Sequence, residues 1–189
     1  MKLHIFNPEH DIALAANQER FTAPHAGRRL RTDLGFIPAF WASEGDMVLV
    51  DDVEAAIEAR RHLSKFGKDV VFVTYADLKA FAFENVESFQ VDPWGWDRTI
   101  KEQLLRANSD FQPFMPSDDT LAAIREMSSR RFAAEHLLPL LREAGEEKTV
   151  GEARYCTTME VVKQAMAQNG KSVLTSPWSS SGRGVRDVE

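Results

Sequence analysis

The chain has 189 residues, 43% of them hydrophobic and 28% charged, a globular balance that excludes wholesale disorder. Its formal net charge of -6 makes it a poor non-specific partner for nucleic acid or for an anionic membrane. A single cysteine, Cys156, excludes an internal disulfide, and the apolar run at the N-terminus is too short for a signal peptide or a membrane span, so the cytoplasm is the expected location.

The first half of the chain alternates between short apolar runs and amphipathic stretches. The apolar runs predict strands at residues 3–6, 47–50 and 70–75. The stretches between them predict helices at residues 9–16, 26–34 and 53–63. Asp52 is placed to cap the third of these helices. This alternation predicts an α/β fold, with a Rossmann-like parallel sheet covered by helices.

The proline-containing segment 110–116 follows a further predicted helix at 97–107 and is the expected connector. We therefore expect two domains, residues 1–115 and 116–189. In the second domain, helices are predicted at residues 118–127, 130–144 and 157–169, and strands at residues 151–156, 172–175 and 185–188. Thr157 and Glu160 have the spacing of a capping box at the start of the last helix.

A loop rich in serine and glycine joins the last two predicted strands. Small residues let backbone N–H groups approach a phosphate closely, while hydroxyl and guanidinium groups add further donors. The candidate phosphate-binding residues are Ser179, Ser180, Ser181, Gly182, Arg183 and Gly184. A Walker A loop is excluded because Val185 stands where the lysine is required, and Asp187 replaces the third small residue of a dinucleotide fingerprint. The alternative interpretation is a solvent-exposed linker.

The loop and the order of the parts around it resemble the ATP-grasp superfamily. Residues 177–184 are similar to the family's Pro-x-Ser-x-Gly-x-Gly loop, which follows a strand and covers the ATP phosphates. The resemblance implies that the Rossmann-like domain is followed by an incomplete α+β ATP-grasp subdomain. It also implies ATP and magnesium as cofactors, a small carboxylate as substrate, and Arg130 or Arg131 as a charge partner of the phosphates.

The implied activity is that of a carboxylate–amine or carboxylate–thiol ligase, which activates its acid as an acyl phosphate. Thr175 departs from the family pattern, because it stands where members usually carry a lysine. The magnesium ligands of the family lie in a later subdomain, so we expect this chain to be a fragment that is inactive alone. The alternatives are a non-catalytic nucleotide-binding or interaction module with a degenerate site, and a plain α/β interaction domain.

Other polar residues have both a functional and a structural interpretation. His10 and Asp11 follow the first predicted strand, where substrates bind in open α/β sheets, although helix capping and dipole compensation by Asn7, Glu9 and Asp11 is favoured. Arg28 belongs to a basic cluster that is a candidate site for a carboxylate or phosphate, although a solvated helix face is favoured. The spacing of the histidines suggests no metal site. The oligomeric state stays open, with a homodimer among the options.

Overall fold

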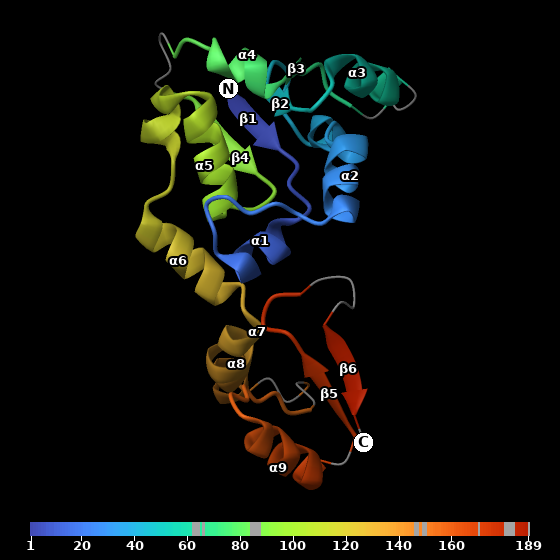
Figure 1. Ribbon diagram of the computed structural model, residues 1–189, viewed down its shortest axis with the longest axis vertical. Coiled ribbons are helices and arrows are strands. Elements are labelled where there is room, and N and C mark those ends of the chain that lie inside the picture. The colour runs from blue at the N-terminus through green and yellow to red at the C-terminus, as the bar shows by residue number, and fades with distance from the viewer. Residues whose placement is uncertain are drawn as a thin grey trace. The chain divides into compact units, whose positions relative to one another are not determined.

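The computed structural model describes residues 1–61, 65, 67–83, 88–145, 148, 151–169, 171–179 and 184–188. The chain divides into two compact units, Met1–Leu121 and Ala122–Glu189, each with its own sheet (Figure 1). The division thus lies after Leu121, whereas the sequence places a boundary after residue 115. Within the described residues, no helix combines the length and the apolar character needed to cross a membrane.

The first unit is built on a sheet of four parallel strands, as the alternation in the sequence predicts. The strands are β1 (Lys2–Ile5), β2 (Met47–Leu49), β3 (Val71–Val73) and β4 (Gln90–Pro93). Their order is β3-β2-β1-β4, so the N-terminal strand pairs with β2 on one side and β4 on the other. This central position explains why Leu3, His4 and Ile5 are all buried.

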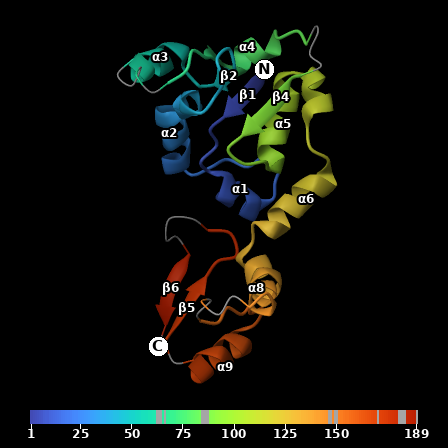
Figure 2. The same cartoon turned by 180° about the vertical axis from the view of Figure 1, so that it is seen from behind.

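Helices cover the sheet on both faces, because alternate side chains of each strand point in opposite directions. They are α1 (His10–Ala16), α2 (His25–Leu34), η1 (Ile37–Phe40), α3 (Val53–Arg61), α4 (Tyr75–Lys79), α5 (Arg98–Ala107) and η2 (Ser109–Phe114). Leu3 and Ile5 pack with α4, α5 and η2 on one face, and Val48 and Phe72 pack with η1 and α3 on the other. Figures 1 and 2 show α5 beside β4, with α2 and α3 at the opposite side of the sheet.

Three features of this unit differ from the sequence predictions. The third strand ends at Val73, because Thr74 forms a capping box with Asp77 that starts α4. The edge strand β4 contains Asp92 and Pro93, residues that an edge tolerates but that give no apolar run in the sequence. The expected connector at 110–116 instead forms most of η2, whose Phe111 is fully buried in the core.

The second unit contains a helical segment, a further helix and a β-hairpin. Its elements, together with the helix α6 that leads into it, are α6 (Asp118–Met127), α7 (Arg130–Phe132), η3 (Ala133–Leu137), α8 (Leu138–Glu143), α9 (Met159–Asn169), β5 (Ser172–Thr175) and β6 (Val185–Val188). The strands β5 and β6 are antiparallel, with Thr175 opposite Val185. The prediction that the serine- and glycine-rich loop joins two strands of one hairpin is therefore confirmed.

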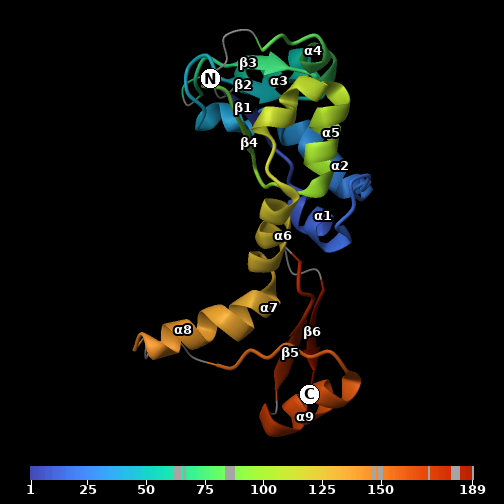
Figure 3. The ribbon, with the colours of Figure 1, turned by 90° about the vertical axis from the view of Figure 1, so that its left-hand side faces the viewer.

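The helix predicted at 130–144 is continuous but irregular, since η3 is a π-helix between two α-helical stretches (Figure 3). Pro139 explains this widening, because it lacks an N–H and its ring would clash with the carbonyl of the preceding turn. The strand predicted at 151–156 was wrong, as these residues adopt no regular structure. The last helix begins at Met159. Its cap is Thr158 and not the predicted Thr157, because the Thr158 hydroxyl accepts the Val161 N–H at 3.3 Å.

A buried polar pair fixes the central strand to its neighbours. Asp46, just before β2, accepts hydrogen bonds from the N–H groups of Lys2 at 2.8 Å and Ser43 at 2.9 Å. The His4 ring contacts the same carboxylate through Nε2 at 3.1 Å, while its Nδ1 lies 3.1 Å from a carboxylate oxygen of Asp92 in β4. Burial would raise the pKa of the Asp46 carboxyl, but these hydrogen bonds outweigh burial and hold the pKa below its ordinary value of 3.8.

We expect Asp46→Asn to lower the free energy of unfolding by about 1–3 kcal/mol at neutral pH, because a charged acceptor of several hydrogen bonds becomes neutral. Since the pKa of Asp46 is lower in the folded state, its contribution is present above the ordinary value and is lost as the pH falls through the folded pKa. Urea denaturation at neutral pH and at about pH 3 should therefore show a difference that shrinks in acid.

Asp69→Asn is the matched control, because the Asp69 carboxylate is exposed and forms an ion pair with Arg60. It should change stability by less than about 1 kcal/mol. If Asp46→Asn were equally mild at neutral pH, the buried pair would not be a stabilising contact.

Candidate functional site

The carboxyl ends of the four parallel strands meet at one edge of the first unit and line a pocket of about 420 Å³. Asn7 and Glu9 follow β1, Asp51 follows β2, Tyr75 follows β3 and Asp97 follows β4. This edge is where open α/β sheets bind their ligands, because the loops that leave successive strands diverge there. The pocket is therefore the candidate small-molecule site of the first unit.

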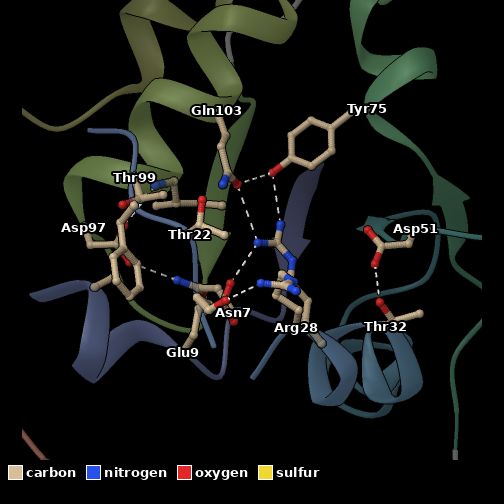
Figure 4. A pocket seen from close by; sticks show the side chains of 15 residues that line it. Asn7, Glu9, Thr22, Arg28, Thr32, Asp51, Tyr75, Asp97, Thr99 and Gln103 are labelled. Atoms are coloured by element: carbon tan, nitrogen blue, oxygen red, sulfur yellow. Dashed lines mark hydrogen bonds and ion pairs between the residues drawn. The ribbon is translucent and has the colours of Figure 1, made fainter. Parts of the chain in front are cut away.

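The partly buried guanidinium of Arg31, on α2, forms one wall of this pocket (Figure 4). Its Nη1 donates to the Glu9 carboxylate at 3.0 Å and lies 3.5 Å from the amide oxygen of Gln103. Its Nη2 donates to the Tyr75 hydroxyl at 3.0 Å, and that hydroxyl donates to Gln103 at 2.8 Å. One arginine thus connects α2 with α5 and with the residues that follow β1 and β3.

The charges in this network are set by burial and by the close partners. Burial alone would lower the pKa of Arg31, but Tyr75 and Glu9 more than offset it and raise the pKa above its ordinary value. Burial raises the pKa of the Tyr75 hydroxyl despite the neighbouring guanidinium, so the phenol stays neutral and can donate. The second carboxylate oxygen of Glu9 is buried and has no hydrogen-bond partner among the described residues.

The loops after β1 and β4 are tied together by Asn7. Its side-chain amide donates to the Gly95 carbonyl at 2.8 Å and accepts the Gly95 N–H at 3.2 Å, so it does not cap α1 as the sequence suggests. The same amide lies 3.3 Å from Asp97, which also contacts the His10 ring at 3.1 Å and caps α5. A Cβ atom at position 95 would lie 2.3 Å from the His10 ring, so a glycine is required there.

The sequence-predicted substrate residues separate into two groups. Arg28 lines the pocket, and its Nη1 donates to the Ala23 carbonyl at 2.6 Å. His10 packs against Asp97 at the pocket's border, and Asp11 lies in the first turn of α1, where a negative charge suits the helix dipole. Arg28 is solvent-exposed on α2, in line with the favoured interpretation of a solvated helix face, and so is Arg29, which pairs with Asp33.

In the second unit, Arg130 holds the start of the hairpin loop. Its Nη1 donates to the Ser176 carbonyl at 2.8 Å and to the Ser179 hydroxyl, and its backbone N–H donates to the Pro177 carbonyl at 2.9 Å. Gly184 closes the loop with a φ of +72°, and its carbonyl accepts the Ser176 N–H at 3.0 Å. A Cβ atom on Gly184 would lie 2.4 Å from the Ser176 hydroxyl, so a larger residue does not fit.

The other candidates of the loop have different positions. Arg131 pairs with Glu126 and Glu135, lies 5.5 Å from the Tyr155 ring centroid and lines the cavity beside the hairpin. Within the loop, the Trp178 indole donates to the Arg125 carbonyl at 2.9 Å, and the Arg125 guanidinium lies 3.8 Å from its ring centroid. The remaining predicted phosphate ligands, Ser180, Ser181, Gly182 and Arg183, lie outside the described residues.

A cavity of about 910 Å³ lies beside the hairpin in the second unit. Arg130, Thr175 and Pro177 line it, together with apolar residues such as Leu138 and Val173. This combination places a cation and the hairpin beside a largely apolar space. The parts of the chain that the structure describes contain no group of three or more His, Cys, Asp or Glu side chains that could hold a metal ion.

Comparison of the chain with protein-family models, with curated proteins and with solved structures gives no match. The sites are therefore defined by their geometry alone.

Asn7 and Asp51 could have been recognised from the sequence as polar residues directly after strands. Tyr75 and Gln103 carry no such signal, because only the packing of α4 and α5 brings them to Arg31.

We expect Arg31→Met to lower the free energy of unfolding by about 3 kcal/mol or more, because it leaves the Glu9 carboxylate buried without its partner. The double change Arg31→Met with Glu9→Gln should recover much of this loss, since no buried charge remains. Urea denaturation measures both. Arg29→Met is the control, and it should cost less than about 1 kcal/mol because its ion pair with Asp33 is exposed. A double variant no more stable than Arg31→Met would contradict this explanation.

Proposed function

We propose that the second unit binds ATP, with the phosphates at the hairpin loop of residues 176–184. The contact of Arg130 with both Ser176 and Ser179 carries this proposal. This contact holds a permanent cation and a serine hydroxyl at the start of the turn that joins β5 and β6. Backbone amides, hydroxyls and a guanidinium are the donors that phosphate oxygens prefer.

Two further observations support a nucleotide at this loop. Gly184 has a left-handed backbone and leaves no room for a Cβ atom, so the loop is built from residues that permit a close approach of the main chain. The cavity of about 910 Å³ beside the loop has the size of a cofactor site and a largely apolar wall. An apolar space next to a cationic loop suits a ligand with a flat base at one end and phosphates at the other.

The activity we propose for the whole protein is that of an ATP-grasp carboxylate–amine or carboxylate–thiol ligase. In this chemistry the acid's oxygen attacks the terminal phosphorus of ATP, ADP leaves, and an amine or thiol then displaces phosphate from the acyl carbon. The role of the described residues would be to bind and orient ATP.

The position of Thr175 favours a second candidate, a non-catalytic module that binds nucleotide with a degenerate site. Thr175 is exposed near the end of β5 and lines the cavity beside the loop. A lysine there would add a second cation to the site. If the site is degenerate, Thr175→Lys should tighten ATP binding by roughly tenfold, as a new charge-assisted hydrogen bond would.

Calorimetric titration with ATP in the presence of magnesium tests the proposal. We expect binding by the unmodified protein, and a Kd that rises at least about tenfold in Arg130→Gln. Arg29→Gln should bind as well as the unmodified protein, because it removes an exposed cation of the first unit. Gly184→Ala should also abolish binding through its clash with Ser176.

Gly145→Ala is the matched control for Gly184→Ala. Gly145 also has a positive φ, but no atom lies within 4 Å of a Cβ at that position, so this change imposes the same backbone strain away from the loop. It should leave ATP binding intact. Failure of the unmodified protein to bind ATP would refute both the ligase and the nucleotide-binding module.

A further inference from the structure

Two opposite charges in the pocket of the first unit are not neutralised by the protein. Arg28 and Asp51 both line this pocket. In the part of the chain that the structure describes, Arg28 bonds only to the Ala23 carbonyl, and Asp51 accepts only the Thr32 hydroxyl, at 2.6 Å. Neither side chain has an ion-pair partner there, although each is within reach of the same cavity.

The other charges around the pocket are already compensated. Glu9 and Arg31 form an ion pair at 3.0 Å. Asp97 contacts Asn7, His10 and the Ile100 N–H. The pocket therefore presents to a ligand one cation and one anion.

These two charges stand on the same side of the cavity. Arg28 and Thr32 are four residues apart on α2 and so share one face of that helix, and Thr32 orients Asp51 from the loop after β2. Figure 4 shows Arg28 and the Thr32–Asp51 pair beside α2. A ligand that carries two opposite charges can therefore meet both side chains from within this pocket.

We propose that this pocket binds a zwitterion of the α-amino acid class, with its carboxylate at Arg28 and its ammonium group at Asp51. A neutral ligand would form an ion pair with neither group, and a polyanion would meet three carboxylates. The volume of about 420 Å³ suits a small molecule, and Ala13, Phe21 and Ile100 supply an apolar wall for its side chain. This site belongs to the first unit, so the proposal goes beyond the nucleotide site and does not depend on it.

Calorimetric titration of the full chain with the L-α-amino acids that carry uncharged side chains, one at a time, tests the proposal. We expect at least one to bind. For the one that binds most tightly, the matching acid without the amino group and the matching amine without the carboxylate should each bind roughly tenfold more weakly or worse. For L-alanine these analogues are propionate and ethylamine.

Arg28→Gln and Asp51→Asn should each raise the Kd of that amino acid by roughly 10-fold to 100-fold. The matched controls are Arg29→Gln and Asp33→Asn, which remove the same charges from an exposed pair on α2 and should leave binding unchanged. Both pocket residues are exposed, so the variants should unfold at the same temperature as the unmodified protein, which a thermal melt checks.

Three results would overturn the proposal: no amino acid binds, a singly charged analogue binds as tightly, or the pocket variants bind like the controls. The same titrations with ATP separate the two proposals. Arg28→Gln and Asp51→Asn should keep any ATP binding, and Arg130→Gln should keep amino acid binding.

Discussion

The ion pair between Arg31 and Glu9 is the contact on which the strand-end edge of the first unit depends. A guanidinium and a carboxylate that are both nearly removed from water are tolerated only when they meet each other and further hydrogen-bonding groups. Tyr75 and Gln103 supply those groups, so α2 is held against elements that are far apart in the sequence. This arrangement uses Arg31 for structure, whereas Arg28, one helical turn away, donates only to the Ala23 carbonyl among the described residues.

The second unit uses an arginine in a related way. Arg130 donates to a backbone carbonyl and a hydroxyl of the loop, so its planar guanidinium shapes the loop while keeping its charge. A lysine would be a poor replacement, because a single ammonium group on a flexible stem does not present two donors in a fixed fork. The irregular helix starts at Arg130 because the Ser129 hydroxyl accepts the Phe132 N–H at 3.1 Å.

The coarse fold could be predicted from the sequence because apolar runs and amphipathic stretches report local burial. Three of the four parallel strands and the hairpin follow from that pattern. β4 could not be predicted in this way, because an edge strand needs no apolar character and tolerates a proline, which lacks an N–H. Its Asp92 and Pro93 resemble a turn in the sequence. The strand predicted at residues 151–156 does not form, because an extended segment is stable only with a partner strand beside it.

The candidate pocket was only partly within reach of the sequence. Residues three or four apart share one face of a helix, so the sequence alone places Arg28 and Arg31 on a different face from Arg29. The contributions of Tyr75 and Gln103 depend on crossovers that no local pattern records. For the hairpin loop, the roles predicted for Ser180, Ser181, Gly182 and Arg183 stay predictions, because these residues lie outside the described part of the chain.

The strand order β3-β2-β1-β4 also constrains how the chain folds during synthesis. β1 leaves the ribosome first, yet its two partners begin only at Met47 and Gln90. Until those residues emerge, Leu3 and Ile5 have no sheet in which to bury their side chains. Parallel pairings across such distances close slowly. The nascent chain therefore carries an internal strand of the sheet unpaired and apolar until β2 and β4 have been made.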